Sequence, residues 1–198
     1  MNNSVAVSAT PTSAHYQRGQ MPSLDAAIRG ALVKPKPGPN GTALLAAGRL
    51  VMTEDGRPIR SIVTGRRRIV TGSYASRKAG RAQMFESMNE HAHFMHCEVD
   101  PWIVDYRAQP FRFEMVLDGS KRIYIADCVR LTAAGIIEVV EVKGDPRFLR
   151  DPDYVAKLGR VRQLCELVGW SFVTLTRQQI IEPQAHGEVQ SRLGAYLG

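Results

Sequence analysis

The segment IIEVVEVKGD, residues 136–145, places two opposite charges inside what its composition predicts to be a buried β-strand. The β-branched residues around the charges favour a central strand of a sheet. Glu141 and Lys143 are two positions apart, so both project from the same face of that strand. Burying a carboxylate and an ammonium is unfavourable unless they are paired or bind something. We therefore expect either a structural ion pair or a functional site here.

A second acid interrupts another apolar segment, RIYIADCVRL, residues 122–131. This segment predicts a strand beside the first, and hairpin-like adjacency would bring Asp127 and Glu141 together at one end of the sheet. Two carboxylates at close range repel and raise each other's pKa. A divalent cation removes that conflict, and a few oxygen ligands suit Mg²⁺, with Mn²⁺ as a substitute. The Lys143 ammonium would then face the attacking water or the scissile phosphate.

A third acid is expected from the preceding segment. Residues 81–97 contain no Gly or Pro, and their apolar residues recur at helical spacing, which predicts a helix. Glu86 and Glu90 are four apart and would share one face of that helix. Either carboxylate could reach the metal, directly or through water.

The pattern of apolar runs and turn signals predicts an α/β fold with a mixed central β-sheet and helices on both faces. Asp118-Gly119 is a hairpin signal. Asp151 is a candidate N-cap of a helix that ends near Gly169. The expected strands cover residues 102–109, 111–117, 122–131, 136–144 and 171–175.

The N-terminal part of the chain differs in composition. Residues 1–45 are rich in Ala, Pro, Ser, Asn and Gly, which indicates a flexible or irregular arm. No apolar run approaches a membrane span, so we expect no membrane partner. The three cysteines are sparse and unpatterned, which favours a reducing compartment, the cytoplasm of a bacterial or phage-infected cell.

The charge balance favours a polyanionic partner. Net charge is +7, and the stretch from Arg60 to Arg81 holds basic residues without a single acid. A solvated surface normally mixes signs, so we expect phosphate contacts from this stretch, with a basic arm as the alternative. Further basic residues lie on the polar face of the helix after Asp151. The candidate DNA contacts are Arg66, Arg67, Arg68, Arg77, Lys78, Arg81, Lys157 and Arg160.

In this order, a helical glutamate, Asp127 and Glu141-Val142-Lys143 resemble the PD-(D/E)xK nucleases. The segments SRKAGRAQMFESMNE, DPWIVDYRAQPF, YIADCVR, VVEVKGD and GWSFVTLT are similar to the nuclease domain of TnsA-type transposon endonuclease subunits. The resemblance covers residues 60–182, between an N-terminal arm of residues 1–59 and a tail of residues 183–198. It implies a restriction-endonuclease-like core that hydrolyses DNA phosphodiester bonds with Mg²⁺.

The resemblance also implies roles for individual residues. Asp127 and Glu141 would be metal ligands together with the Val142 carbonyl, and Lys143 would be the catalytic lysine. Phage junction resolvases of the same fold carry a Ser-x-x-Glu pattern, which favours Glu90 over Glu86 as the additional acid. Gln109, in the Ala-Gln-Pro stretch, would position the substrate or a water molecule.

Two departures from the family bear on the biological role. Ala126 stands where the family usually has Pro, and TnsA-type proteins typically carry a further C-terminal domain. A transposase or another mobile-element protein is an expected partner besides DNA, and a homo-oligomer stays open. A free-standing phage nuclease fits equally well. The alternatives are a branched-DNA (junction) resolvase and a non-catalytic DNA-binding or virion assembly protein with the same fold.

The segment HAHFMHC offers a different kind of metal ligand. It contains His91, His93, His96 and Cys97 on one expected helix. These residues spread over several helix faces, and no second ligand pair follows downstream, so a zinc site is not favoured. Cys128 is expected to point away from Asp127 into the core.

Overall fold

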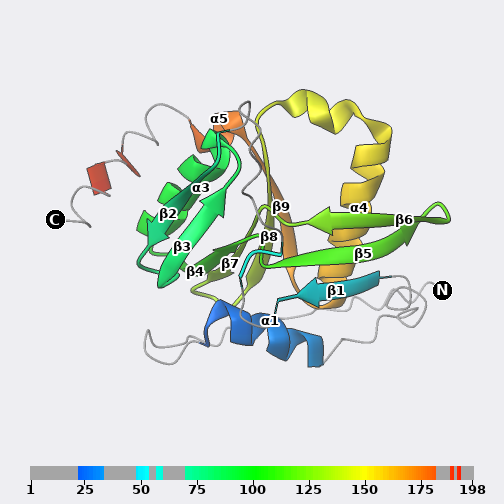
Figure 1. Cartoon of the computed structure of the whole chain (residues 1–198), viewed down its shortest axis with the longest axis horizontal. Coiled ribbons are helices and arrows are strands. Elements are labelled where there is room, and N and C mark those ends of the chain that lie inside the picture. Colours follow the sequence, from blue (N-terminus) through cyan, green and yellow to red (C-terminus); the bar gives the residue numbers. More distant parts are fainter. Residues whose placement is uncertain are drawn as a thin grey trace, which may run out of the picture.

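The computed structural model describes residues 22–33, 48–53, 57–59, 70–181, 188–189 and 191–192. These residues form a mixed α/β structure (Figure 1). The expected α/β class is therefore confirmed. Arg66, Arg67 and Arg68 lie outside the described residues. None of the helices in the described ranges is both long enough and apolar enough to cross a membrane.

The main sheet has four strands in the order β4-β7-β8-β9. The first three are antiparallel neighbours, whereas β8 and β9 are parallel, so the sheet is mixed as expected. Helix α4 connects β8 to β9, which is the crossover that a parallel pair requires. The strands are β4 (Ile103–Ala108), β7 (Cys128–Thr132), β8 (Ile137–Lys143) and β9 (Ser171–Thr176).

The chain passes from β4 of the main sheet into a second sheet, whose strand order is β1-β5-β6. Its strands are β1 (Gly48–Met52), β5 (Phe111–Leu117) and β6 (Ser120–Ile125). The turn between β5 and β6 has positive φ angles at Asp118 (50°) and Gly119 (72°), as an Asp-Gly hairpin requires. The prediction of one strand over residues 122–131 is wrong in detail, because the chain changes sheets at Ala126 and Asp127.

Two helices cover opposite faces of the main sheet (Figure 1). Helix α4 (Pro152–Leu167) packs on β9, β5 and β6, and α3 (Met88–Val99) packs on β4 and β8. Alternating residues of β8 accordingly enter two different apolar clusters, with Val139 on the α4 side and Val140 on the α3 side. Asp151 caps α4 through the amide of Asp153 at 3.0 Å, and Gly169 follows the helix with φ of 79°.

The expected helix over residues 81–97 is wrong in its first half. Residues Arg81–Phe85 form β3, which pairs with β2 (Gly72–Ser76). The helix begins only after Ser87, whose hydroxyl oxygen accepts a hydrogen bond from the Glu90 amide at 3.1 Å. Pairing with a neighbouring strand therefore overrides the helical spacing of the apolar residues.

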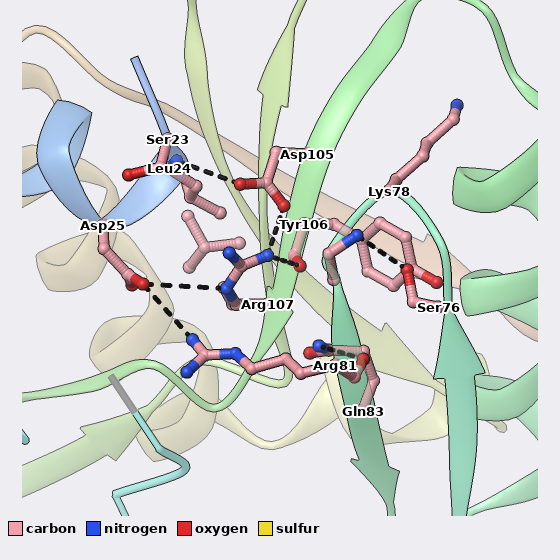
Figure 2. A network of polar contacts seen from close by, with 12 residues as sticks. Ser23, Leu24, Asp25, Ser76, Lys78, Arg81, Gln83, Asp105, Tyr106 and Arg107 are labelled. Carbon is pink, nitrogen blue, oxygen red and sulfur yellow. Dashed lines mark hydrogen bonds and ion pairs between the residues drawn. The ribbon is translucent and has the colours of Figure 1, made fainter. Parts of the chain in front are cut away.

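The expectation of an irregular arm over residues 1–59 is wrong for α1 (Leu24–Val33), and residues 48–52 of the same stretch form β1. Leu24 is fully buried in the core, and its amide donates to Asp105 Oδ2 at 3.0 Å. Asp25 forms ion pairs with Arg81 at 3.3 Å and with Arg107 at 3.8 Å (Figure 2). This part of the arm is thus anchored to the folded domain by both apolar and ionic contacts.

Two short elements complete the description. The 3₁₀ helix η1 (Pro146–Arg150) follows β8 directly, and α5 (Arg177–Ile180) follows β9. A capping box begins α5, since the Thr176 amide donates to Gln179 Oε1 at 2.8 Å.

Candidate active site at the junction of the two sheets

Asp127 lies where the chain leaves the three-stranded sheet and enters the main sheet. The register that pairs Cys128 with Val140 places Asp127 opposite Glu141, one position beyond the last paired residues. Asp127 Oδ2 accepts a hydrogen bond from the Val142 amide at 2.8 Å. Its other oxygen, Oδ1, accepts no hydrogen bond from the part of the chain that the structure describes. Asp127 is therefore fixed to β8 while one oxygen keeps its lone pairs free.

Glu141 is buried in the middle of β8 and holds three polar partners. Tyr124 donates its hydroxyl to Oε2 at 2.7 Å, and Tyr154 donates its hydroxyl to Oε1. The Lys143 ammonium lies 2.6 Å from the same Oε1. These contacts offset the cost of removing the carboxylate from water.

Lys143 is partly exposed at the end of β8, between the acid and two aromatic rings. Its Nζ lies 5.1 Å from the ring centre of Tyr154 and 5.9 Å from that of Phe148. Burial alone would lower the pKa of Lys143, but the Glu141 carboxylate outweighs it and the pKa is raised above its ordinary value. Lys143 is therefore a cation at neutral pH.

Glu90 lies in the first turn of α3 and is buried. Its carboxylate accepts hydrogen bonds from the Glu86 amide at 2.9 Å and from the Ser87 hydroxyl at 3.1 Å. The Ser-x-x-Glu spacing therefore works as a helix cap in this structure. Glu86 precedes the helix, so the two glutamates do not share a helix face.

The start of α3 reaches the end of β8. A methyl group built at Gly144, the residue after Lys143, would meet the Asn89 side-chain amide at 2.9 Å. Burial raises the pKa of Asp127 well above its ordinary value, and the carboxylates of Glu141 and then Glu90 add to the rise, against Lys143 and the Val142 amide. Three acids from separate segments therefore act on one another at this point.

Gln109 lies beside Asp127, where the chain passes from β4 of the main sheet to β5 of the second sheet. Its backbone N–H donates to the Asp127 carbonyl at 3.3 Å. Its φ of 46° is in the left-handed region, which is strained for a residue with a side chain. The side chain is buried, and its Oε1 has no hydrogen-bond partner among the described residues. Strain and an unpaired buried oxygen are typical of functional sites.

The basic residues expected to contact DNA fall into different environments. Lys78 points into the protein, where its ammonium donates to the carbonyls of Cys97 (2.8 Å) and Asp100 (2.5 Å) at the end of α3 and to that of Ile103 (2.7 Å) at the start of β4. Arg81 pairs with Asp25 of α1. Both positions give these residues structural roles, and neither places a free positive charge at the acids.

Two other candidates lie on α4, the helix that also carries Tyr154. Lys157 Nζ is 5.3 Å from the ring centre of Tyr154, whose hydroxyl contacts Glu141. Arg160 follows on the same helix and donates to Gln163 at 3.1 Å. Arg77 is exposed, and its backbone amide donates to Glu98 at 2.9 Å. Among the described candidates, Lys157 is the one that the structure places beside a partner of Glu141.

Sequence reasoning missed Tyr124 and Tyr154. Both alternate with apolar residues, and their apolar positions gave no reason to separate them from the core. Burial raises the pKa of Tyr124 well above its ordinary value, with the Glu141 carboxylate as the next cause; burial and the hydrogen bond to Glu141 do the same for Tyr154. A buried tyrosine needs a partner for its hydroxyl, and that was the available signal.

No protein-family model and no curated protein sequence matches the chain. Among solved structures, the crystal structure of protein VC1899 from Vibrio cholerae is similar with 13% sequence identity and a TM-score of 0.31. The similarity covers 55% of this chain and 32% of VC1899, so the chain spans about a third of that protein's length. A similarity of this size does not identify a function for this chain.

Proposed function

We propose that this protein is a Mg²⁺-dependent DNA endonuclease with a restriction-endonuclease-like core, similar to the TnsA-type subunits. The observation that carries the proposal is the placement of Asp127 opposite Glu141, beside Lys143 at the end of β8, with Glu90 adding to the rise in the pKa of Asp127. Such an arrangement is costly for a metal-free protein, because the pKa of Asp127 is raised by burial and by the other two acids.

The donor atoms fit a hard divalent cation. They are carboxylate oxygens, which Mg²⁺ and Mn²⁺ prefer, and Asp127 Oδ1 has its lone pairs free toward the described residues. Asp127 and Glu141 would hold the ion with the Val142 carbonyl, and Glu90 would contribute directly or through water. A bound cation would remove the repulsion between the acids and would supply Lewis-acid activation of the phosphate and of a water molecule.

The residues of the chain itself divide the remaining work. Lys143 is held in place by Glu141 at 2.6 Å and keeps its proton, since its pKa is raised. It therefore stabilises negative charge on the scissile phosphate as a cation and does not act as a general base. Tyr154 donates to the same oxygen of Glu141 and restricts where the ammonium can lie.

The substrate would be held through its backbone. Lys157 lies beside the Tyr154 ring, Arg160 is on the same helix, and Arg77 is exposed. Contacts from such residues position DNA without reading its sequence. Gln109, buried next to Asp127 with its Oε1 unpaired among the described residues, would orient a water molecule or the substrate. A transposase or another mobile-element protein would direct the cut.

One observation favours a second candidate. Both oxygens of Glu141 already accept hydrogen bonds or an ion pair, as they would in a purely structural buried charge pair. A non-catalytic DNA-binding or virion assembly protein with this fold would show the same contacts. The two candidates differ in whether DNA is cut.

The test uses purified protein with supercoiled and with branched DNA, in Mg²⁺, Mn²⁺ or chelator. The nuclease predicts metal-dependent nicking that Asp127→Asn and Lys143→Ala abolish while DNA binding persists. Asp153→Asn and Lys121→Ala change exposed residues of the same charge outside the proposed metal site, and they should leave nicking intact. DNA binding without metal-dependent cutting would establish the second candidate, and preferential cutting of branched DNA would identify a junction resolvase.

A further inference from the structure

A second group of metal-binding side chains lies on the opposite side of the sheet from Glu141. His93 and Cys97 are four residues apart on α3, and Cys128 is the first residue of β7. All three are buried, at 2%, 1% and 0% exposure. Their ligand atoms lie within 4.8 Å of one another, and His93 Nε2 is 3.5 Å from Cys97 Sγ. Cys128 is distant in sequence from the two helix residues and approaches them only through the fold.

The distances fit one small ion. Zinc binds imidazole nitrogen and thiolate sulfur at about 2.0 to 2.3 Å, so two ligands of the same ion are about 3.5 Å apart. His93 and Cys97 already have that separation. Cys128 comes from a different element, and its Sγ is directed toward the Val129 carbonyl at 3.7 Å. A small rotation of this side chain would complete three ligands of a tetrahedron.

Charge and softness point to the same ion. Two thiolates and Zn²⁺ sum to zero, so the loaded site would bury no net charge among the apolar residues around it, which include Phe94, Ala108 and Val140. Sulfur and imidazole ligands select zinc over Mg²⁺, which prefers oxygen. The chain would thus separate a soft site from a hard one at two consecutive residues, Cys128 and Asp127.

We propose that His93, Cys97 and Cys128 form a zinc site that fixes helix α3 to strand β7. His93 lies one turn after Glu90, and Cys128 follows Asp127 directly. An ion at this position would therefore hold together the two segments that carry Glu90 and Asp127. Zinc binding by these residues does not depend on the nuclease activity, so either proposal can fail without the other.

The test measures zinc in protein purified under reducing conditions, and then titrates metal-free protein with Zn²⁺ and with Co²⁺. One zinc per chain is expected, and Co²⁺ should produce thiolate-to-cobalt absorption in the near ultraviolet. Cys97→Ala and Cys128→Ala should lose both signals. Cys165→Ala removes a third buried cysteine outside the group and should retain them, as should Asp127→Asn.

A measurement on the unmodified chain covers the case in which the alanine variants do not fold. Zn²⁺ should protect Cys97 and Cys128 from alkylation and leave the rate at Cys165 unchanged. The proposal is overturned if the wild-type chain contains no zinc and binds none on titration. It is equally overturned if a Cys97–Cys128 disulfide is found in the reduced preparation, or if zinc protects all three cysteines alike.

Discussion

The carboxylate of Asp127 is bonded at 2.8 Å to the amide of Val142, although the two residues are 15 positions apart. Val142 is the residue between Glu141 and Lys143, so this one hydrogen bond holds the aspartate next to the charged pair of β8. The acids cannot move apart to relieve their repulsion while the sheet is intact. In the metal-free protein, repulsion between the acids therefore lowers the stability of the fold.

Replacing Asp127 by Asn should stabilise the metal-free protein at neutral pH. Burial and then Glu141 raise the folded-state pKa of Asp127 above its unfolded value, so stability is lost as pH rises from about 4 through that raised pKa. Asn keeps an oxygen for the Val142 amide and carries no charge. We expect about 0.5 to 2 kcal/mol of added unfolding free energy near pH 7 and none near pH 3, measured by denaturant titration.

Added Mg²⁺ should shrink this advantage, because the wild type gains binding free energy that the variant lacks. The control is Asp153→Asn, which changes an exposed acid and should be neutral at both pH values. A wild-type protein more stable than Asp127→Asn at neutral pH without metal would show that the site carries no repulsion.

Glu141 and Lys143 should be coupled energetically. In a double-mutant cycle with Glu141→Gln and Lys143→Met, we expect a coupling free energy of about 1 to 3 kcal/mol in unfolding experiments. The glutamate side chain is 4% exposed, so losing its partner leaves a charge with little access to water. The matched control is Arg49 with Glu114, a pair at 2.9 Å on the surface, where water screens both charges and little or no coupling is expected. Equal coupling in both pairs would contradict the special environment of the first.

Tyr154→Phe should lower stability and activity together, whereas Tyr124→Phe should act mainly on stability. Each substitution removes one hydroxyl that donates to Glu141 and costs about 1 to 3 kcal/mol. Only Tyr154 shares its carboxylate oxygen with Lys143, so its loss frees the ammonium to shift. The check is unfolding free energy alongside the nicking rate at saturating Mg²⁺. Equal rates in both variants would remove the positioning role of Tyr154.

Lys78→Met should destabilise the protein by about 1 to 2 kcal/mol without a large change in DNA affinity. The Lys78 ammonium donates to the carbonyls of Cys97 and Asp100 at the C-terminal end of α3, where a positive charge interacts favourably with the helix dipole, and to the carbonyl of Ile103 in β4. Lys121→Met, at an exposed position, is the control and should change stability little. A variant with normal stability and much weaker DNA binding would return Lys78 to the set of DNA contacts.

The strands that carry the charged residues were predictable because period-two patterns and an Asp-Gly turn are local signals. Residues 111–117 form a strand as predicted, and the predicted helix after the Asp151 cap is also present. The helix prediction for residues 81–87 was wrong because their apolar spacing fits a helix as well as a strand. Only the pairing of β3 with β2 decides between helix and strand. The break at Asp127 was invisible for a similar reason, since the passage between sheets depends on partners far along the chain.

The candidate site divides in the same way. Glu141 and Lys143 stood out because a charge inside an apolar strand is visible in the sequence alone. The hydroxyl partners of Glu141, and the approach of Cys128 to His93 and Cys97, needed coordinates because each joins elements that are distant in sequence. Sequence also overstated the reach of the basic stretch, since the Lys78 side chain turns inward to cap a helix.

The hairpin of β5 and β6 leaves the main sheet and returns to it at neighbouring points, where the Gln109 amide meets the Asp127 carbonyl at 3.3 Å. Its base is therefore closed, whatever the length of the excursion. Residues inserted at the Asp118-Gly119 tip would extend this arm without moving its base. The tip is accordingly where the protein can accept new sequence, such as a fused tag or an arm that reaches another molecule, while the acids keep their positions.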